Sequence, residues 1–382
     1  MSHQLNDQIE EAKRLLGENN ADGALRVLKP YRKSLKSTNS SHIELHQAFV
    51  EAYLENGQLE RAYPLLVKAC ELDPQGQIGG SDKFFTLGQI AGGSDGLALI
   101  TQGIENLSGQ AGDYLKQEQA EKIVAGLLSM VEIWMTDLCM EPGAEAQCEE
   151  LVSKAMEVSE EKSPEAWAAL GSMRISQQRF PEAAEAFGRS WHFFQAKKSA
   201  FESEVQQGSG NTHTEFANML QPLLNLAKMC IEMGLYEWAL EIEAAVKDID
   251  EDNLESLYLE AFTHYLTCKL ELFKLQNPQV EVNPGNVYEF NQHFQELPFV
   301  NANELIQEHG QEARLILTYM VKLAENGDQN DEVVKELVSG AMEVLSELGG
   351  PADIKDVIRY RKGEEIGDEE EIEIDIEGCN QA

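Results

Sequence analysis

The stretch Ser163 to Phe194 reads SPEAWAALGSMRISQQRFPEAAEAFGRSWHFF and predicts two short amphipathic helices joined by a tight turn. Two small residues, Gly171 in the first helix and Ala183 in the second, allow the helices to approach closely. The larger apolar side chains placed to fill the space around that contact are Trp167, Leu170 and Phe187. A pair of this length cannot bury its apolar faces alone, so the stretch predicts similar pairs on both sides.

The spacing W-x2-L-G followed by A-x3-F resembles the tetratricopeptide repeat (TPR), a two-helix unit of about 34 residues. Arg174 departs from the pattern, because the family usually has Tyr there. Two further units are clear, at 43–74 and at 220–250, and the first contains ENGQLERAYPLLVKACELDP. The resemblance therefore implies an all-α fold, a TPR-type solenoid of helical hairpins wound as a right-handed superhelix over residues 1–350.

The remaining segments fit this pattern less well. Residues 5–31 predict a degenerate first repeat, and the glycine-rich residues 76–112 predict a loose third repeat with a poor second helix. Tyr114 to Met140 predicts one long helix, partnered by residues 145–159. Residues 196–214 are expected to be an insertion that extends a helix and then forms a loop.

The C-terminal part contains a second interruption. Asn253 begins another repeat, whose second helix is interrupted by a proline-rich insertion at 276–300. Helical periodicity resumes at 302–324 and 331–348, which we interpret as the last pair or a cap. Residues 351–382 are expected to form an acidic C-terminal tail, and its like-charged block from Gly363 predicts disorder in isolation. Its alternation of Ile and Glu also fits a strand or docking on a basic partner.

Charge restricts the partner. The 382-residue chain has a formal net charge of -37, which would repel nucleic acid and anionic membranes and favours a basic partner. Its six cysteines are scattered without a C-x-x-C pair, as in a reducing compartment. The N-terminus has no signal-peptide pattern, and no apolar run reaches the roughly 18 residues of a membrane span.

No motif for catalysis, cofactor binding or metal binding is recognisable. A nucleophile elbow, a phosphate-binding loop and a dinucleotide-binding fingerprint are all missing from the sequence. His42 and His46 share one helix face at a spacing that could hold a metal, but no third ligand converges on them, so packing is favoured. We therefore expect a binding protein rather than an enzyme, with no cofactor.

In TPR solenoids the first helix of each repeat lines a concave groove that binds peptides. In this register the groove positions are mostly acidic, with aromatic residues at one end, and would attract an extended Lys/Arg-rich segment. The competing interpretation is that these carboxylates are simply solvated helix faces. The predicted partner-binding residues are Glu44, Gln47, Glu51, Glu55, Asp137, Glu141, Glu165, Glu232, Glu255, Tyr258, Phe262 and Tyr265.

Four segments together resemble a narrower family, the fungal dedicated assembly chaperones of large-subunit ribosomal protein number four. They are ALRVLKP, ENGQLERAYPLLVKACELDP, GLYEWALEIEAAVKDIDEDNLESLYLEAF and DIKDVIRYRKGEEIGDEEEIEID. The resemblance implies capture of the basic internal loop of a newly made client in the groove. It also implies escort from cytoplasm to nucleus, with nuclear import machinery involved indirectly. We expect a monomer, because the groove must stay open for the client.

Two other classes stay open from the residues alone. One is a generic TPR scaffold for a non-ribosomal partner, and the other is a chaperone of histones or other basic proteins, which an acidic tail also fits. Both share the fold, so only the identity of the partner separates them.

Overall fold

The computed structural model describes residues 2–112, 114–206, 216–327 and 331–364, and every regular element in them is a helix. These residues divide into two compact units, 1–177 and 178–382, and the border falls in the turn at the centre of the repeat 163–194. The all-α fold built from helix pairs is therefore confirmed. None of the described helices combines the length and the apolarity needed to cross a bilayer.

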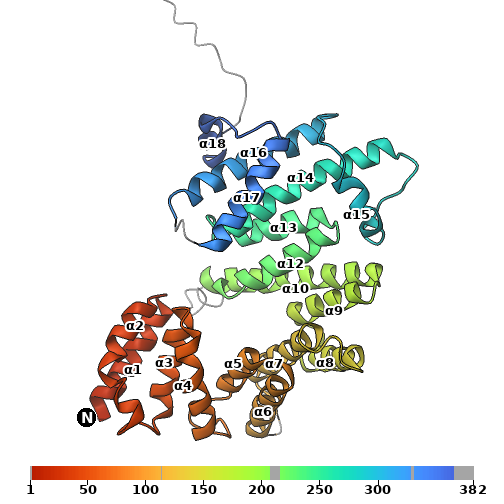
Figure 1. The fold of residues 1–382 in the computed structure, drawn as a ribbon. Helices are drawn as coiled ribbons and strands as arrows, with labels where there is room; N and C mark the ends of the chain where they lie inside the picture. The colour runs from red at the N-terminus through yellow and green to blue at the C-terminus, as the bar shows by residue number, and fades with distance from the viewer. Residues whose placement is uncertain (1, 113, 207–215, 328–330, 365–382) are drawn as a thin grey trace, which may run out of the picture. The chain divides into compact units, whose positions relative to one another are not determined.

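The first unit is a row of antiparallel helix pairs followed by a single helix, as Figure 1 shows. Each pair buries small residues at its centre, as Ala12, Ala24 and Ala62 do with no exposed surface. The helices are α1 (Ser2–Gly17), α2 (Ala21–Leu28), α3 (Ile43–Glu55), α4 (Leu59–Leu72), α5 (Asp82–Ala91), α6 (Gly93–Ala111), α7 (Gln117–Met135), α8 (Ala144–Val158) and α9 (Pro164–Ser176).

The glycine-rich repeat is better formed than predicted, so the expectation of a poor second helix was wrong. Helix α6 is continuous over 19 residues and packs along α5. A Cβ atom at Gly96 would lie 2.5 Å from the backbone oxygen of Gly88, so the two backbones touch. Gly103 and Gly126 leave room for the ring of Phe85 in the same way. The glycines are contact points between helices, and this packing overrides their low helix propensity.

The helix expected from Tyr114 to Met140 is shorter, because α7 covers Gln117–Met135. A turn follows it, and Gly143, in a left-handed conformation (φ 86°), precedes α8. The sequence did not predict this early end, because apolar residues continue beyond Met135.

Between α4 and α5 the chain forms a loop held by a buried ion pair. Asp73 forms an ion pair of 2.9 Å with Lys83 Nζ. The Asp73 carboxylate also accepts hydrogen bonds from the backbone N–H groups of Gln77, Ile78 and Gly79. These bonds lower the pKa of Asp73 to about 2, although its burial acts in the opposite direction. The loop is therefore firmly held against the two helices that it joins.

The second unit contains α10 (Phe180–Gln206), α12 (Leu220–Glu232), α13 (Tyr236–Lys247), α14 (Leu254–Gln276), α15 (Val287–Gln295), α16 (Glu304–Ala324), α17 (Glu332–Glu347) and α18 (Ile354–Arg361). Helix α12 pairs with α13, and α14 pairs with α16. The interpretation of 302–324 and 331–348 as one pair is therefore corrected, because α16 is the second helix of the repeat that Asn253 begins. The insertion at 276–300, which contains α15, separates the two helices of that repeat.

Two predicted segments extend beyond the described residues. Helix α10 continues to Gln206, and the rest of the insertion predicted at 196–214 lies outside what the structure describes. Helix α18 forms within the segment predicted as an acidic tail and packs against α16, where Figure 1 shows it in dark blue. The tail from residue 365 onward also lies outside the described part.

Candidate partner-binding face

Helix α3, the first helix of its repeat, carries exposed carboxylates at the predicted groove positions. Its apolar residues are buried, which leaves Glu44, Glu51 and Glu55 on the opposite, exposed side. Burial of the Glu51 carboxyl within the fold raises its pKa, and the negative charges of Glu55 and Asp82 raise it further, against the attraction of Lys13. The first helices lie side by side in two runs of this unit, α1 with α3 and α5 with α7 and α9. We call the side of the first helices in each unit the groove face.

The acidic character of this face is moderated by Lys122. Lys122 on α7 forms an ion pair of 2.9 Å with Asp82 on α5, and a second one of 3.3 Å with Glu118. Gln47 is not free for a partner, because its side-chain amide donates to the carbonyl of Gly79 at 2.6 Å. Within the first unit, Glu44, Glu51 and Glu55 are therefore the predicted residues best placed to attract a cation.

Three predicted residues are placed differently from the groove positions expected of them, and the side chains of two make structural contacts. Asp137 and Glu141 lie beyond the end of α7, so neither is on a first helix as the sequence predicted. Asp137 accepts the backbone N–H of Gly93 at 2.8 Å and so caps the first turn of α6. Glu165 lies in the first turn of α9 and accepts the hydroxyl of Ser163 at 2.9 Å.

The second unit presents an aromatic row on α14. Tyr258 and Phe262 stack with ring centroids 5.7 Å apart, and Phe262 and Tyr265 with centroids 6.1 Å apart. Tyr258 and Phe262 remain partly exposed, whereas Tyr265 is buried. Glu255, one turn before the row, is in an ion pair of 2.6 Å with Lys228 on α12.

Helix α17 packs along this row and contacts both its first and its last residue. A Cβ atom at Gly340 would lie 2.7 Å from the hydroxyl oxygen of Tyr258, and Tyr265 donates its hydroxyl to Glu347 at 2.7 Å. Glu343 raises the pKa of Tyr258, after the larger effect of burial. The sequence interpretation missed Glu343 and Glu347, although their i, i+4 spacing places both on one side of α17.

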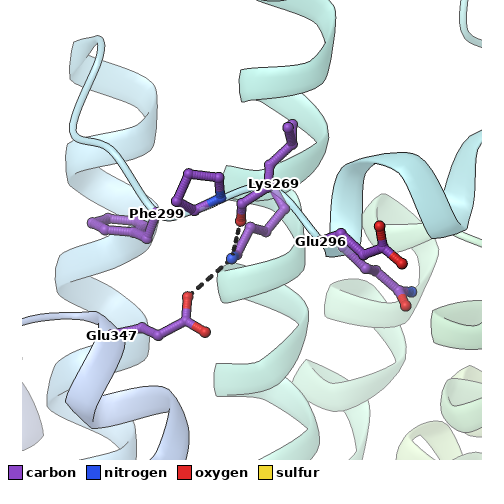
Figure 2. A pocket seen from close by; sticks show the side chains of 7 residues that line it. Lys269, Glu296, Phe299 and Glu347 are labelled. Carbon is purple, nitrogen blue, oxygen red and sulfur yellow. Dashed lines mark hydrogen bonds and ion pairs between the residues drawn. The ribbon is translucent and has the colours of Figure 1, made fainter.

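An open hollow follows Tyr265 along α14, between that helix, α17 and the insertion. Figure 2 shows Lys269 at its centre, where Nζ donates to the carbonyl of Leu297 and forms an ion pair of 2.9 Å with Glu347. Glu296 and Phe299 line the hollow on either side. A second hollow contains Glu232 together with Phe180 and Tyr288, whose rings stack at 4.0 Å. Glu232 itself is exposed.

The two histidines considered as metal ligands have local hydrogen-bond partners. His42 accepts the backbone N–H of Leu45 and so begins α3, and His46 Nδ1 lies 2.8 Å from the carbonyl of His42. No three His, Cys, Asp or Glu side chains converge as a metal site anywhere in the described ranges.

Repeated antiparallel helix pairs define the class: a TPR-like helical-repeat protein. Comparison with known proteins agrees with the sequence resemblance. A family model described as "ACL4 C-terminal domain" matches residues 252–373, which is less than half of the chain. The chain resembles a solved structure described as "Assembly Chaperone of RpL4 (Acl4) (Residues 1-338)", with TM-score 0.52 and 23% identity, covering 70% of this chain and 97% of that one. This likeness supports the fold.

Two curated fungal relatives, both described as "Probable assembly chaperone of rpl4", also match. The protein from Schizosaccharomyces pombe is 27% identical over 276 residues, which cover 71% of this chain and 70% of the relative. The protein from Emericella nidulans is 26% identical over 270 residues, 69% of this chain and 65% of the relative, just under two thirds of its length. The chain is a homologue of the fungal assembly chaperones of Rpl4.

Proposed function

We propose that this chain is a dedicated chaperone of the large-subunit ribosomal protein Rpl4. The observation that carries the proposal is the similarity to two fungal relatives described as chaperones of this client, each aligned over about 70% of the chain. The net charge of -37 supports it independently, because a ribosomal protein must present basic surface to RNA and attracts an acidic binder. The matching proteins are described as chaperones rather than enzymes.

In this mechanism the groove face captures a basic internal loop of newly made Rpl4. Carboxylates such as Glu51 and Glu55 attract the loop, and the rings of Tyr258 and Phe262 offer flat surfaces on which arginine side chains stack. The captured loop is kept soluble and away from non-specific RNA during transfer from cytoplasm to nucleus. Release follows when the phosphates of ribosomal RNA compete with the groove carboxylates for the same Lys and Arg side chains of the loop.

Glu51 and Glu55 offer the sharpest test, because no ion pair holds either carboxylate within the described residues, unlike Glu255 with Lys228. We expect the double variant Glu51→Lys, Glu55→Lys to bind purified Rpl4 at least tenfold more weakly than the unchanged protein at physiological salt. The matched control is Glu60→Lys, Glu157→Lys, which reverses two exposed carboxylates on the second helices α4 and α8 and keeps the same net charge.

Three outcomes separate the alternatives. Equal weakening by both double variants would replace capture at the groove face with general charge attraction. Affinity that does not change between low and physiological salt would contradict the electrostatic mechanism altogether. Affinity purification that recovers histones, or a stable complex of neutral proteins, in place of Rpl4 at one-to-one ratio would leave the TPR-like fold and overturn the client.

A further inference from the structure

Helix α18 is a basic segment in a strongly acidic chain. Residues 354–362 read IKDVIRYRK and contain four of the 30 Lys and Arg residues that face 67 acidic residues in the whole sequence. The segment is therefore rich in Lys and Arg, like the basic partner expected to bind the acidic remainder of the chain.

The helix lies on an acidic and aromatic surface of the second unit. Arg361 forms ion pairs with Glu251 at 2.8 Å and with Asp252 at 3.1 Å, both in the turn between α13 and α14. Its guanidinium carbon lies 4.3 Å from the ring centroid of Tyr319 on α16, and the Tyr319 hydroxyl donates to Asp252 at 2.6 Å. Arg361 is therefore recognised by two carboxylates and one ring, an arrangement well suited to a guanidinium group.

Deeper in the same surface, Tyr360 lies beside Glu260 of α14 and Glu312 of α16. Burial raises the pKa of the Tyr360 hydroxyl, and the negative charges of these two carboxylates raise it further. Val357 is 3% exposed and supplies the apolar contact. We call Glu251, Asp252, Glu260, Glu312 and Tyr319 the latch surface, and α18 occupies it.

One carboxylate oxygen of the latch surface is not satisfied by α18. Glu260 is 8% exposed, and its Oε1 forms an ion pair of 2.5 Å with Lys247. Its Oε2 is fully buried and has no hydrogen-bond partner within the described residues. A buried carboxylate oxygen without a donor is unfavourable. A ligand that brings an N–H donor to this position therefore binds the surface more favourably than α18 does.

The attachment of α18 is also easily reversed. Glu251 and Asp252 are more than half exposed, and exposed ion pairs contribute little to stability. The segment before the helix is held more firmly, because Arg314 donates to the carbonyls of Gly350 and Pro351 and Thr318 accepts the N–H of Ala352. The helix can therefore leave the surface while the chain up to Ala352 stays in place.

We propose that the latch surface is a second binding site for an Arg/Lys-rich segment of the basic partner, and that α18 is an intramolecular ligand that closes it until the partner displaces it. The basic nature of the partner rests on the proposed function, whereas the occupation of the surface by α18 does not. Because α18 is tethered, it competes at high effective concentration and raises the apparent Kd of any external segment.

The test uses the full chain and a fluorescent synthetic peptide with the sequence of residues 352–364, ADIKDVIRYRKGE. The unlatched variant Tyr360→Ala, Arg361→Ala should bind this peptide at least tenfold more tightly than the unchanged chain. The control Lys362→Ala removes one exposed charge next to the latch and should bind like the unchanged chain. Adding Glu251→Lys and Asp252→Lys to the unlatched variant should weaken binding of the peptide at least tenfold, because the new lysines repel its arginine side chains.

Equal peptide binding by the unchanged, unlatched and control chains would overturn the latch, as would binding that the Glu251 and Asp252 reversals do not weaken. If the unlatched variant does not fold, hydrogen exchange on the unchanged chain decides: excess peptide should speed exchange of the α18 amides, and unchanged exchange overturns the proposal. Failure of Rpl4 to bind any of these chains would overturn the proposed client while the peptide result still supports the latch.

Discussion

The two units each bury a lysine, and the two lysines have different surroundings. Lys83 in the first unit and its partner Asp73 are both almost completely buried, with 1% and 6% of their side chains exposed. Lys269 in the second unit is equally buried at 2%, but its partner Glu347 is 50% exposed and faces an open hollow. The first pair closes a loop between two helices, whereas the second leaves a carboxylate in reach of a partner. The buried lysine of the first unit, Lys83, therefore has a structural role, whereas Lys269 of the second unit lies at a candidate binding site.

The largest loss of stability should come from breaking the buried ion pair between Asp73 and Lys83. Asp73→Ala leaves the Lys83 ammonium buried without its carboxylate and removes the acceptor of three loop N–H groups. We expect the free energy of unfolding of the first unit to fall by about 3–5 kcal/mol, measured by urea denaturation. Glu71→Ala breaks the exposed pair with Lys68 and should cost less than about 1 kcal/mol, so equal losses would contradict the comparison.

The pH dependence of this pair has a defined sign. Because the pKa of Asp73 is lowered from 3.8 to about 2 in the folded protein, its contribution is fully present above pH 3.8 and is lost as the pH falls through about 2. The Asp73→Ala variant should lack that part of the acid sensitivity.

The glycine contact of the first unit should give the next largest effect. Gly96→Ala places a Cβ atom 2.5 Å from the backbone oxygen of Gly88, which cannot move without shifting α5. We expect a loss of about 1–3 kcal/mol in the same denaturation experiment. Gly109→Ala is the control on the same helix, since nothing lies within 4 Å of its Cβ position, and it should stabilise the chain by about 0.4–1 kcal/mol. Stabilisation by both variants would show that α5 and α6 are not in close contact.

Removing Glu347, the half-exposed partner of Lys269, should have a smaller effect on stability. Glu347→Ala takes the acceptor from the Tyr265 hydroxyl and from Lys269, but water can reach the half-exposed position and replace it. We expect a loss of about 1 kcal/mol, well below that of Asp73→Ala. Glu343→Ala, one turn earlier on α17, should change stability by less than about 0.5 kcal/mol. A loss as large as that for Asp73→Ala would show that the two pairs are equivalent.

Glu243, which is fully buried on α13, should show its effect in the pH dependence of stability. Burial raises the pKa of Glu243 to about 8, against the hydrogen bond from Ser256, so the carboxyl holds a proton at pH 7. The folded state then binds a proton that the unfolded chain releases near pH 4.5, and stability falls as the pH rises from about 4.5 to about 8. Glu243→Gln should flatten that decline, so the variant gains stability relative to the unchanged chain as the pH rises from about 4.5 to about 8, measured as midpoints of urea denaturation against pH.

The helix pairs that the sequence predicted correctly are those whose pattern lies within one short stretch of the chain. The clear repeats carry their small and large apolar residues at fixed spacing, so the helix pairs at 43–74 and 220–250 followed directly. The glycine-rich repeat was misjudged, because glycine disfavours an isolated helix and its benefit at Gly88 and Gly96 exists only when α5 and α6 touch. The partner of α14 was misjudged as well, because the insertion at 276–300 moves it away from α14 in sequence.

The candidate groove was predicted in part for the same reason. Glu51, Glu55 and the aromatic residues on α14 follow from helical periodicity within one element. The capping contact of Asp137 and the bond of Gln47 to Gly79 involve residues far apart in the sequence, so they were not recognised. Whether the remaining predicted positions bind Rpl4 stays a prediction.

By itself the sequence determined the all-α class, the repeated hairpins, the strong negative charge and the resemblance to the fungal chaperones, because composition and helical periodicity are properties of neighbouring residues. Only the tertiary structure decided which carboxylates are free and which are engaged. It paired Asp73 with Lys83, Glu347 with Lys269 and Glu251 with Arg361. The physical reason is that the charge available to a partner depends on burial and on the nearest opposite charge, and in folded repeats both come from residues distant along the chain.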